Sequence, residues 1–437
     1  MTADAPSRDL RRRQILTVVL LFAGYAGYYF CRADLSVATP LLVEELRAHG
    51  FTPKEALIRI GDISSASVFA YALGKMLFGG LGDLWGGRRS FLVGLGGATL
   101  FTLLFVSGGT LPIFTLAWIG NRLTQSIGWA GLLKVCSRWF DYTSYGTIVG
   151  ILSLSYLIGD AAARQSMGAL IEHGFGWRAL FYFAAAVAGI LFVANFLLLR
   201  ESRVEAGFRE ATPNPLNLFA SNDARPASIL ALLKPLFFSK AFALVCVLSF
   251  GCTVVRETFN TWTPVYLRDY VGYSAGRAGS LSAIFPLLGA ASVLATGMIS
   301  DRLGPNGRAA ILLLGLITTA AALAALMASP AGMEHAMTTL VLIGVVAFCL
   351  LGPYSYLGGA FALDFGGKQA GAVSSGIIDG VGYLGGVLAG DTVARISAAY
   401  GWRGVFITLA VVSAASAAAA GLLYLHQGRR AAQKVTQ

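Results

Sequence analysis

Charged residues are scarce in this chain of 437 residues. Asp, Glu, Lys and Arg together make up 13% of the sequence, whereas 56% of the residues are hydrophobic. An average soluble protein carries about twice that share of charge. The mean hydropathy is +0.68. The composition therefore excludes an ordinary soluble domain and indicates a protein that lies in a lipid bilayer.

Histidine is also rare, and the long apolar runs contain none. The four histidines lie between these runs or near the end of the chain, at His49, His173, His335 and His426. This placement removes the commonest proton relay and any histidine metal site from the apolar part. The five cysteines lie in apolar runs without CxxC spacing, so we interpret them as small buried hydrophobic residues.

Nucleotide-binding and catalytic motifs are missing as well. The sequence contains no phosphate-binding P-loop, no dinucleotide fingerprint and no nucleophile elbow. These absences disfavour ATP-driven transport and enzymatic activity. We therefore predict no catalytic residue, no cofactor and no metal site.

Long apolar runs dominate the rest of the sequence. Each is close to the roughly 20 residues that a membrane-spanning helix needs. We count twelve of them, at 15–46, 60–82, 90–108, 112–138, 146–170, 178–199, 241–267, 277–299, 309–328, 337–363, 370–395 and 403–425. They predict an all-α membrane protein with twelve transmembrane helices.

The net charge of +11 could indicate nucleic acid as a partner, but its distribution argues against that. In a twelve-span topology most Lys and Arg residues fall on the side that holds both termini, which the positive-inside rule places in the cytoplasm. The polar stretch between the sixth and seventh runs is then a cytoplasmic linker. We predict an N-terminal tail 1–14, a six-helix bundle 15–199, a linker 200–240, a six-helix bundle 241–425 and a C-terminal tail 426–437.

Three motifs recur at nearly constant offset. Arg32 precedes a Thr-Pro pair by seven residues, and Arg256 does the same 224 residues later. A glycine, three residues, an aspartate and a glycine-rich basic turn occur around Asp83 and again around Asp301, 218 residues later. A Gly-Trp-Arg triplet at 176–178 returns at 401–403. These repeats predict two matching halves, and parallel six-helix repeats are a known transporter plan.

Arg32 stands near the middle of the first apolar run. An arginine at that depth costs at least about 3 kcal/mol by insertion scales, so it should face a cavity or a partner rather than lipid. Tyr25 and Tyr29 share its helix face at spacings of seven and three residues. Interfacial belts also use tyrosine, but these two lie too deep for that role. Together with Arg256, they predict a central anion site.

The fifth run places Tyr156, Asp160 and Arg164 on one helix face at spacings of four. An intrahelical ion pair between Asp160 and Arg164 would be cheap to bury, and it is compatible with a face that lines the transport cavity. Asp391 and Arg395 have the same spacing nearer the outer surface, where we expect a surface pair.

Other intramembrane charges have weaker signals. Lys75 lies nearer the inner end, where its long side chain could also reach the surface. Arg122 requires an acidic or backbone partner. Glu257 follows Arg256 directly and should point about 100° away from it on a helix. Asp379 and Tyr383 share a face at a spacing of four.

The glycine–aspartate–basic turns are similar to the signature loop of the major facilitator superfamily. More specifically, the chain resembles its organophosphate:phosphate antiporter family over nearly all of its length outside the ends and the linker. The resemblance is carried by YYFCRADLSVATPLLVEEL from Tyr28, YALGKMLFGGLGD from Tyr71, GW at 128–129 with Trp139, VVRETFNTWTPVYL from Val254 and GKQAGAVSSGIIDGVGYLGG from Gly367.

This resemblance implies that Arg32 and Arg256 bind the phosphate, one from each half. It implies that Lys75, Tyr25, Tyr29 and Tyr383 line the cavity. By the same resemblance, the charged turns act in gating, through Asp83, Arg88, Asp301 and Arg302. Two departures lie in the fifth apolar run, 146–170, where Tyr156 replaces the family histidine and Asp160 replaces a small residue. A third is Thr261, where an acidic residue often stands. In the fourth apolar run, 112–138, the pattern Arg122-Gln125-Gly128 looks more like that of proton-driven members of the superfamily.

The resemblance predicts a secondary transporter that exchanges a phosphorylated small metabolite for inorganic phosphate by alternating access. Its partners are that substrate, phosphate and the lipid bilayer, and we expect a monomer in a bacterial inner membrane. Two alternatives stay open. One is a proton-coupled carrier of another organic anion or polyol that uses Asp160 or Asp379 as its proton site. The other is a membrane sensor of sugar phosphate.

Overall fold

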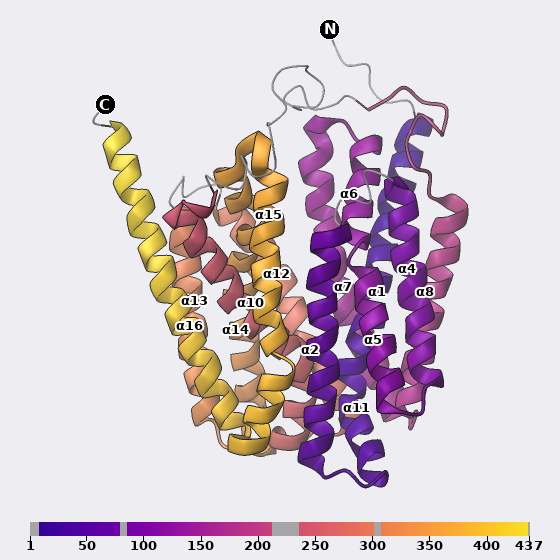
Figure 1. The fold of residues 1–437 in the computed structure, drawn as a ribbon, viewed down its shortest axis with the longest axis vertical. Helices are drawn as coiled ribbons and strands as arrows, with labels where there is room; N and C mark the ends of the chain where they lie inside the picture. The colour runs from indigo at the N-terminus through magenta and orange to yellow at the C-terminus, as the bar shows by residue number, and fades with distance from the viewer. Residues whose placement is uncertain (1–7, 79–84, 212–235, 301–306, 436–437) are drawn as a thin grey trace.

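The computed structural model describes residues 8–78, 85–211, 236–300 and 307–435. The regular structure in these ranges is helical throughout. Two bundles of long helices stand side by side, and both chain ends lie at the same end of the bundles, at the top of Figure 1. We call this the terminal end and the opposite one the far end.

The first bundle contains seven helices that form six spans. They are α1 (Arg8–Ala48), α2 (Pro53–Phe78), α4 (Gly87–Ser107), α5 (Leu111–Gln125), α6 (Gly128–Trp139), α7 (Tyr142–Glu172) and α8 (Trp177–Leu198). The run expected as one helix over 112–138 is broken into α5 and α6. The first helix begins at Arg8, earlier than the apolar run, because its arginine-rich first turns can extend beyond the hydrocarbon layer.

The second bundle repeats this plan. Its helices are α10 (Lys240–Tyr266), α11 (Ala275–Leu281), α12 (Ile284–Ser300), α13 (Gly307–Ala328), α14 (Ala336–Tyr356), α15 (Ala362–Leu388) and α16 (Asp391–Val435). Short π-helical turns extend α10 and α14. Gly401, at φ 68°, interrupts α16 and separates the end of the eleventh span from the twelfth.

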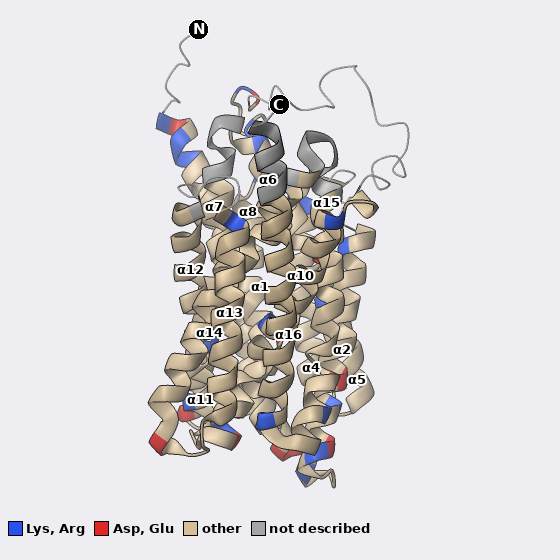
Figure 2. Cartoon of the chain, turned by 90° about the vertical axis from the view of Figure 1, so that its left-hand side faces the viewer, with Lys and Arg blue, Asp and Glu red and all other residues tan. Residues whose placement is uncertain are grey.

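The twelve predicted spans are confirmed. Within the described ranges, nine helical stretches are long and apolar enough to cross a membrane, and one of them, Ser374–Gln427, holds two spans. The α5–α6 pair and α7 supply the other two. Figure 2 shows that charged residues gather at the two ends of the helices and are sparse between them. The chain therefore has the fold of a multi-span membrane protein.

Each bundle has its own aromatic core. In the first, Phe105 stacks on Phe181 with ring centroids 4.5 Å apart, beside the fully buried Trp118. In the second, Phe259 stacks on Phe285 at 5.2 Å. Because these clusters lie within a bundle rather than between bundles, each bundle can move as a packed unit.

α1 and α10, the first helices of the two halves, share one backbone device. Each contains an internal proline directly after a threonine. Thr39 donates its hydroxyl to the Leu35 carbonyl at 2.7 Å, and Thr263 donates to the Phe259 carbonyl at 2.6 Å. These bonds stabilise the helix where proline disrupts the ladder.

Two glycine seams join the bundles toward the far end. A Cβ added at Gly390 would lie 2.7 Å from the Gly61 carbonyl oxygen, so α2 and the end of α15 approach backbone to backbone. A Cβ added at Gly276 would lie 2.7 Å from the Gly168 carbonyl oxygen, so α11 and α7 do the same. In each seam the second span of one half meets the fifth span of the other. This arrangement is the structural form of the internal repeat.

Charged side chains close the far end beyond these seams. Arg268 donates to the Pro40 carbonyl at 2.9 Å and forms an ion pair with Glu44 of α1. Arg395 Nη2 lies 3.7 Å from Oδ1 of Asp62 in α2. Both contacts cross from one bundle to the other, so the far end of this conformation is sealed.

Candidate functional site

Arg32 lies between the bundles in the middle of α1. Its guanidinium carbon stands 5.2 Å from the centre of the Tyr29 ring and 4.8 Å from that of Tyr71 on α2. One Nη1–H donates to the Tyr29 hydroxyl at 3.5 Å. No ion pair with a carboxylate is formed by Arg32 among the described residues. In the described ranges the central cation of the first bundle therefore contacts aromatic faces and not a carboxylate within ion-pair distance.

The backbone just before Arg32 departs from helical geometry. Cys31 has φ −80° and ψ 19°, and its carbonyl accepts a hydrogen bond from Gln125 Nε2 of α5 at 3.0 Å. A carbonyl that leaves the helix ladder needs another donor, and Gln125 supplies it. The side chain of Gln125 thus stabilises the non-helical backbone of α1 beside Arg32.

Arg256 occupies the corresponding place in α10 with different partners. Its Nη2 lies 2.7 Å from Glu257 Oε1, and only 12% and 4% of the two side chains are exposed. Its guanidinium carbon lies 4.7 Å from the centre of the Tyr354 ring and 5.6 Å from that of Tyr383. The expectation that Glu257 points away from Arg256 is wrong, because the two long side chains bend toward each other.

Lys75 connects the two arginine environments. Its Nζ lies 5.4 Å from the centre of the Tyr71 ring, 5.0 Å from that of Tyr383 and 3.3 Å from Asp379 Oδ2. The Tyr71 and Tyr383 rings meet edge to face with centroids 4.9 Å apart, one from each bundle. Tyr71 was missing from the predicted site, although its spacing of four from Lys75 was a usable signal.

The predicted tyrosines of the first bundle lie around Arg32. The ring of Tyr25 is 5.9 Å from that of Tyr29, and Tyr29 is 5.7 Å from Tyr156 of α7. Tyr25 also contacts Trp129 of α6 at 5.1 Å. The structure thus brings Tyr25, Tyr29 and Tyr156 to one wall beside the central cation.

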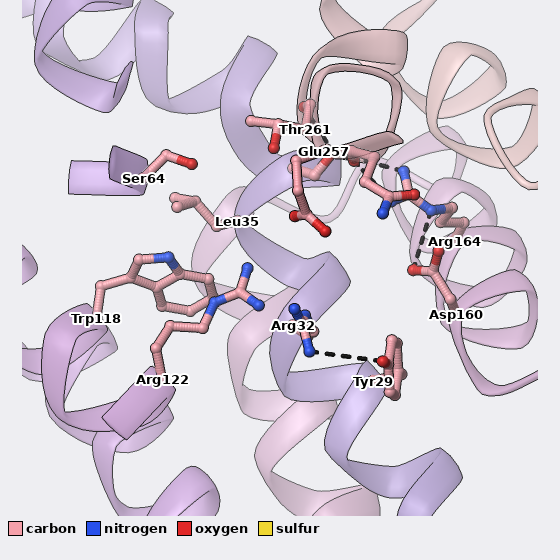
Figure 3. Close-up of a pocket in the computed structure, with 12 residues that line it drawn as sticks. Tyr29, Arg32, Leu35, Ser64, Trp118, Arg122, Asp160, Arg164, Glu257 and Thr261 are labelled. Atoms are coloured by element: carbon pink, nitrogen blue, oxygen red, sulfur yellow. Dashed lines mark hydrogen bonds and ion pairs between the residues drawn. The ribbon is translucent and has the colours of Figure 1, made fainter. Parts of the chain in front are cut away.

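A cavity lies on the far-end side of Arg32 and is shown in Figure 3. It is lined by charged, polar and apolar side chains: Tyr29, Arg32, Leu35, Ser36, Ser64, Trp118, Arg122, Asp160, Arg164, Glu257, Asn260 and Thr261. Residues from both bundles form its walls. Charge concentrated in an enclosed intramembrane cavity is typical of a substrate pathway.

Asp160 and Arg164 form the expected intrahelical ion pair, with Oδ1 and Nε 3.1 Å apart. Arg164 also crosses to the second bundle. Its Nη2 donates to the Asn260 carbonyl at 2.7 Å and its Nη1 donates to Ser282 Oγ at 3.1 Å. Ser36 of α1 donates to the same Asn260 carbonyl at 2.8 Å. Arg164 therefore links the bundles at the far-end wall of the cavity, a role that sequence spacing did not indicate.

Arg122 lines the cavity and is buried with unmatched donors. It is 7% exposed, and its Nε and Nη1 have no hydrogen-bond partner. Its guanidinium carbon stands 5.4 Å from the centre of the Trp118 ring. The sequence required an acidic or backbone partner for this residue, and the described part of the chain supplies no ion pair within 4 Å.

Of the predicted gating residues, Arg88 is the one that the described ranges contain, and it does not line the cavity. Asp83, Asp301 and Arg302 fall outside the described residues. Arg88 lies at the terminal end of α4, where its Nη2 donates to the Phe196 carbonyl at 2.5 Å. Glu201 accepts from the backbone N–H groups of residues 87 and 88 and pairs with Arg138 at 3.0 Å. This cluster ties α4 and α6 to the chain that follows α8. In the described ranges, no group of three His, Cys, Asp or Glu could hold a metal ion.

Solved structures show the same fold. A bacterial homolog of the human lysosomal transporter Spinster, in an inward-facing and unoccupied conformation, superposes with a TM-score of 0.75 at 14% identity, over 96% of this chain and 98% of that one. At this identity the likeness concerns the fold alone.

Curated relatives are more similar in sequence. A probable hexose phosphate transport protein of Chlamydia pneumoniae is 26% identical over 414 residues, which cover 89% of this chain and 86% of that protein. The glycerol-3-phosphate transporter of Bacillus subtilis is 24% identical over 91% of this chain and 89% of its own length. Sugar phosphate exchanger 3 of Bos taurus is 26% identical over 81% and 77%.

The sequence model of the Major Facilitator Superfamily matches residues 15–390, which cover most of both bundles. The twelve spans, the repeated halves and the charged cavity between them fit the plan of this family of transporters, which is not a family of enzymes. The chain belongs to the major facilitator superfamily.

Proposed function

We propose that this transporter moves a phosphorylated small metabolite, such as a sugar phosphate or glycerol phosphate, in exchange for inorganic phosphate. The observation that carries the proposal is the approach of Arg32 and Arg256, one from each bundle, to the two sides of the Tyr71–Tyr383 pair. Guanidinium groups bind phosphate oxygens through two parallel N–H bonds, and two cations match a phosphate near dianionic charge.

The relatives support the same substrate class. The three curated relatives described above are named as carriers of hexose phosphate, glycerol 3-phosphate and sugar phosphate. They share about a quarter of their residues with this chain over most of its length. The arginine contexts of α1 and α10 lie within the matched region. The proposal therefore rests on two grounds: the suitability of two arginines for binding phosphate, and the sequence similarity to carriers of phosphorylated metabolites.

Alternating access supplies the mechanism. In the present conformation the glycine seams, Arg164 and the Arg268–Glu44 pair hold the far end closed. A phosphate that bridges Arg32 and Arg256 draws the two bundles together around the cavity. The resulting rotation opens one end as it closes the other, and phosphate that moves in the opposite direction resets the carrier.

The membrane topology follows from the same proposal. Bundles 15–199 and 241–425 act as the two rocking units, joined by the linker 200–240. Both termini and this linker lie in the cytoplasm, as the excess of Lys and Arg on that side indicates. The protein works as a monomer, because a single chain already contains both arginines. Its place in this proposal is a bacterial inner membrane.

Proton coupling has less support. Asp160 and Asp379, the carboxylates that such a carrier would use, form ion pairs with Arg164 and Lys75. Both carboxylates are thus already engaged by a cation in this conformation. The sensor alternative differs from the proposal in turnover rather than in binding, so a transport measurement separates them.

The test is exchange of radiolabelled phosphate in proteoliposomes loaded with phosphate. Hexose 6-phosphate, glycerol 3-phosphate and a phosphoglycerate serve as competitors. We expect saturable exchange that one competitor inhibits and that persists when an ionophore collapses the proton gradient. Folded protein, verified by its thermal unfolding, that exchanges no phosphate would refute the antiporter. Exchange that stops with the gradient would establish the proton-coupled carrier instead.

A further inference from the structure

The cavity beyond Arg32 contains more positive charge than the phosphate clamp requires. Of its charged side chains, Arg164 pairs with Asp160 at 3.1 Å, and Glu257 pairs with Arg256 at 2.7 Å. Arg32 and Arg122 also line the cavity, and neither forms an ion pair among the described residues. Both of these cations come from the first bundle. The cavity therefore presents a second guanidinium beside the central one.

Arg122 is directed into this cavity. Figure 3 shows its guanidinium extending from α5 toward Arg32 and Glu257, with Trp118 behind it. The residue is 93% buried, and two of its nitrogen atoms, Nε and Nη1, have no acceptor. Burial of a cation with unmatched donors is unfavourable. Such an arrangement is found where a ligand supplies the missing acceptors.

Arg122 has a different aromatic partner from Arg256 and Lys75, which contact the Tyr71–Tyr383 pair. Those two cations contact Tyr383, whereas Arg122 contacts Trp118. Arg32 belongs to both environments, because it stacks on Tyr71 and lines the cavity. The part of a substrate that extends from Arg32 into this cavity would therefore meet Arg122.

We propose that Arg122 binds a carboxylate at the distal end of the substrate, so that the carrier prefers phosphorylated carboxylic acids to phosphorylated alcohols and sugars. The inference rests on the proposed function and adds the chemistry of the organic part. A carboxylate supplies the charge and the acceptors that a guanidinium requires, whereas a hydroxyl supplies no charge. Ser64, Asn260 and Thr261 line the same cavity and offer hydrogen bonds to the carbon chain's hydroxyl groups.

A structural role for Arg122 is the rival explanation. Asp34 of α1 is fully buried, and its Oδ2 has no hydrogen-bond partner. Its Oδ1 accepts from the Leu35 backbone N–H at 2.8 Å. If Arg122 served only to offset this carboxylate at a distance, its removal would weaken the fold and lower the affinity for every substrate by the same factor.

The experiment compares two esters that differ at one end. Glycerol 3-phosphate ends in a hydroxymethyl group, and 3-phosphoglycerate ends in a carboxylate. Each is titrated against phosphate exchange by wild-type protein and by Arg122→Gln and Arg122→Lys. Arg11→Gln, an exposed arginine at the terminal end of α1, controls for the loss of one positive charge. Inorganic phosphate is titrated in parallel.

We expect wild-type protein to prefer 3-phosphoglycerate by about 10- to 100-fold, the range of a charge-assisted hydrogen bond. In Arg122→Gln this preference should fall to about one, and in Arg122→Lys it should be intermediate. Arg11→Gln should keep the wild-type preference. The quantity to follow is the ratio of the two affinities, since the loss of a cation also lowers the affinity for phosphate.

Equal affinities for the two esters in wild-type protein would overturn the inference, whatever the variants do. A preference that survives in Arg122→Gln would also overturn it, as would equal losses for both esters. These outcomes differ from failure of the proposed function, in which wild-type protein exchanges neither inorganic phosphate nor either ester. The ratio of the two affinities in wild-type protein is itself a test. The inference can therefore be refuted even if Arg122→Gln does not fold.

Discussion

The two bundles use equivalent features at the far end of their interface. Gly61 of α2 meets Gly390, and Gly168 of α7 meets Gly276, so that the second and fifth spans cross in both seams. The surrounding sequence is repeated too: the pattern Arg-x-Gly-x-x-Ser occurs at 59–64 and again at 277–282. In the second copy the glycine of this pattern is Gly279, and a Cβ added there would lie 3.3 Å from Gly168 Cα, so it belongs to the same close approach.

At the centre of the molecule the two copies differ. Arg32 is followed by Ala33 and has no carboxylate partner among the described residues, whereas Arg256 is followed by Glu257 and pairs with it at 2.7 Å. The central arginine of the second bundle is thus paired with a carboxylate, and that of the first is not. The seams are therefore alike in the two halves, whereas the central arginines differ in their partners.

The first prediction replaces the guanidinium group of Arg32 by the ammonium group of lysine. Arg32→Lys should lower phosphate exchange by at least about 100-fold, because lysine keeps the charge but loses the paired N–H donors and the stacking on Tyr71. Initial rates in proteoliposomes measure the effect. Arg11→Lys is the same substitution on an exposed part of α1 and should be neutral. Unchanged exchange in Arg32→Lys and also in Arg256→Lys would rule out the phosphate clamp.

The second prediction makes the same change in the other bundle. Arg256→Lys should lower exchange by about 10-fold, less than Arg32→Lys, because Glu257 already offsets the charge at this position. The two variants are measured side by side at saturating and at low phosphate. A loss larger than that of Arg32→Lys would show that the ion pair with Glu257 does not diminish the contribution of Arg256.

The third prediction disturbs a seam. A Cβ at Gly168 would lie 2.5 Å from the Gly276 carbonyl oxygen, so Gly168→Ala should prevent full closure of the far end and slow exchange by several-fold, about 3- to 10-fold. Gly150→Ala, on the same helix with open space around it, is the matched control.

The state of the far end can be followed directly in these two variants. A cysteine introduced at Thr261, which lines the cavity, should react faster with an impermeant maleimide applied from the far side in Gly168→Ala than in Gly150→Ala. Equal labelling in both variants would mean that the seam tolerates a methyl group and is not needed for closure.

The fourth and smallest expected effect makes the two arginines more alike. Glu257→Gln should tighten phosphate binding by about 3- to 10-fold, because Arg256 then faces the anion without a competing carboxylate. Equilibrium binding of phosphate to purified protein measures it, with the exposed Glu334→Gln as control. Weaker binding in Glu257→Gln would mean instead that the carboxylate positions Arg256 for its ligand.

Much of this architecture could be predicted from the sequence. In lipid, the backbone N–H and C=O groups of an apolar run of about 20 residues are paired within the run when it is helical. The twelve spans therefore follow from hydropathy. The helix period places Tyr29 and Arg32 on one face and predicts the ion pairs Asp160–Arg164 and Asp391–Arg395, which the structure shows at 3.1 Å and 2.7 Å. These are local properties, and local geometry is fixed once a segment is helical.

The interactions between helices were decided by the tertiary structure. Helix period alone separated Glu257 from Arg256, yet the two flexible side chains meet in the cavity. Nothing in the spacing of Arg164 indicated that it would reach Asn260 and Ser282 of the other bundle. Tyr71 became part of the site only because α2 packs against α15 and places its ring 4.9 Å from that of Tyr383.

The sequence by itself therefore determined how many helices cross the membrane, that the halves are related, and which charges lie inside the bilayer. The compensation of those charges depends on which helix faces come within about 4 Å of each other, and that distance is set by side-chain packing over the whole molecule. Only the tertiary structure could decide that Lys75 and Arg256 are paired while Arg32 and Arg122 form no ion pair within the described residues.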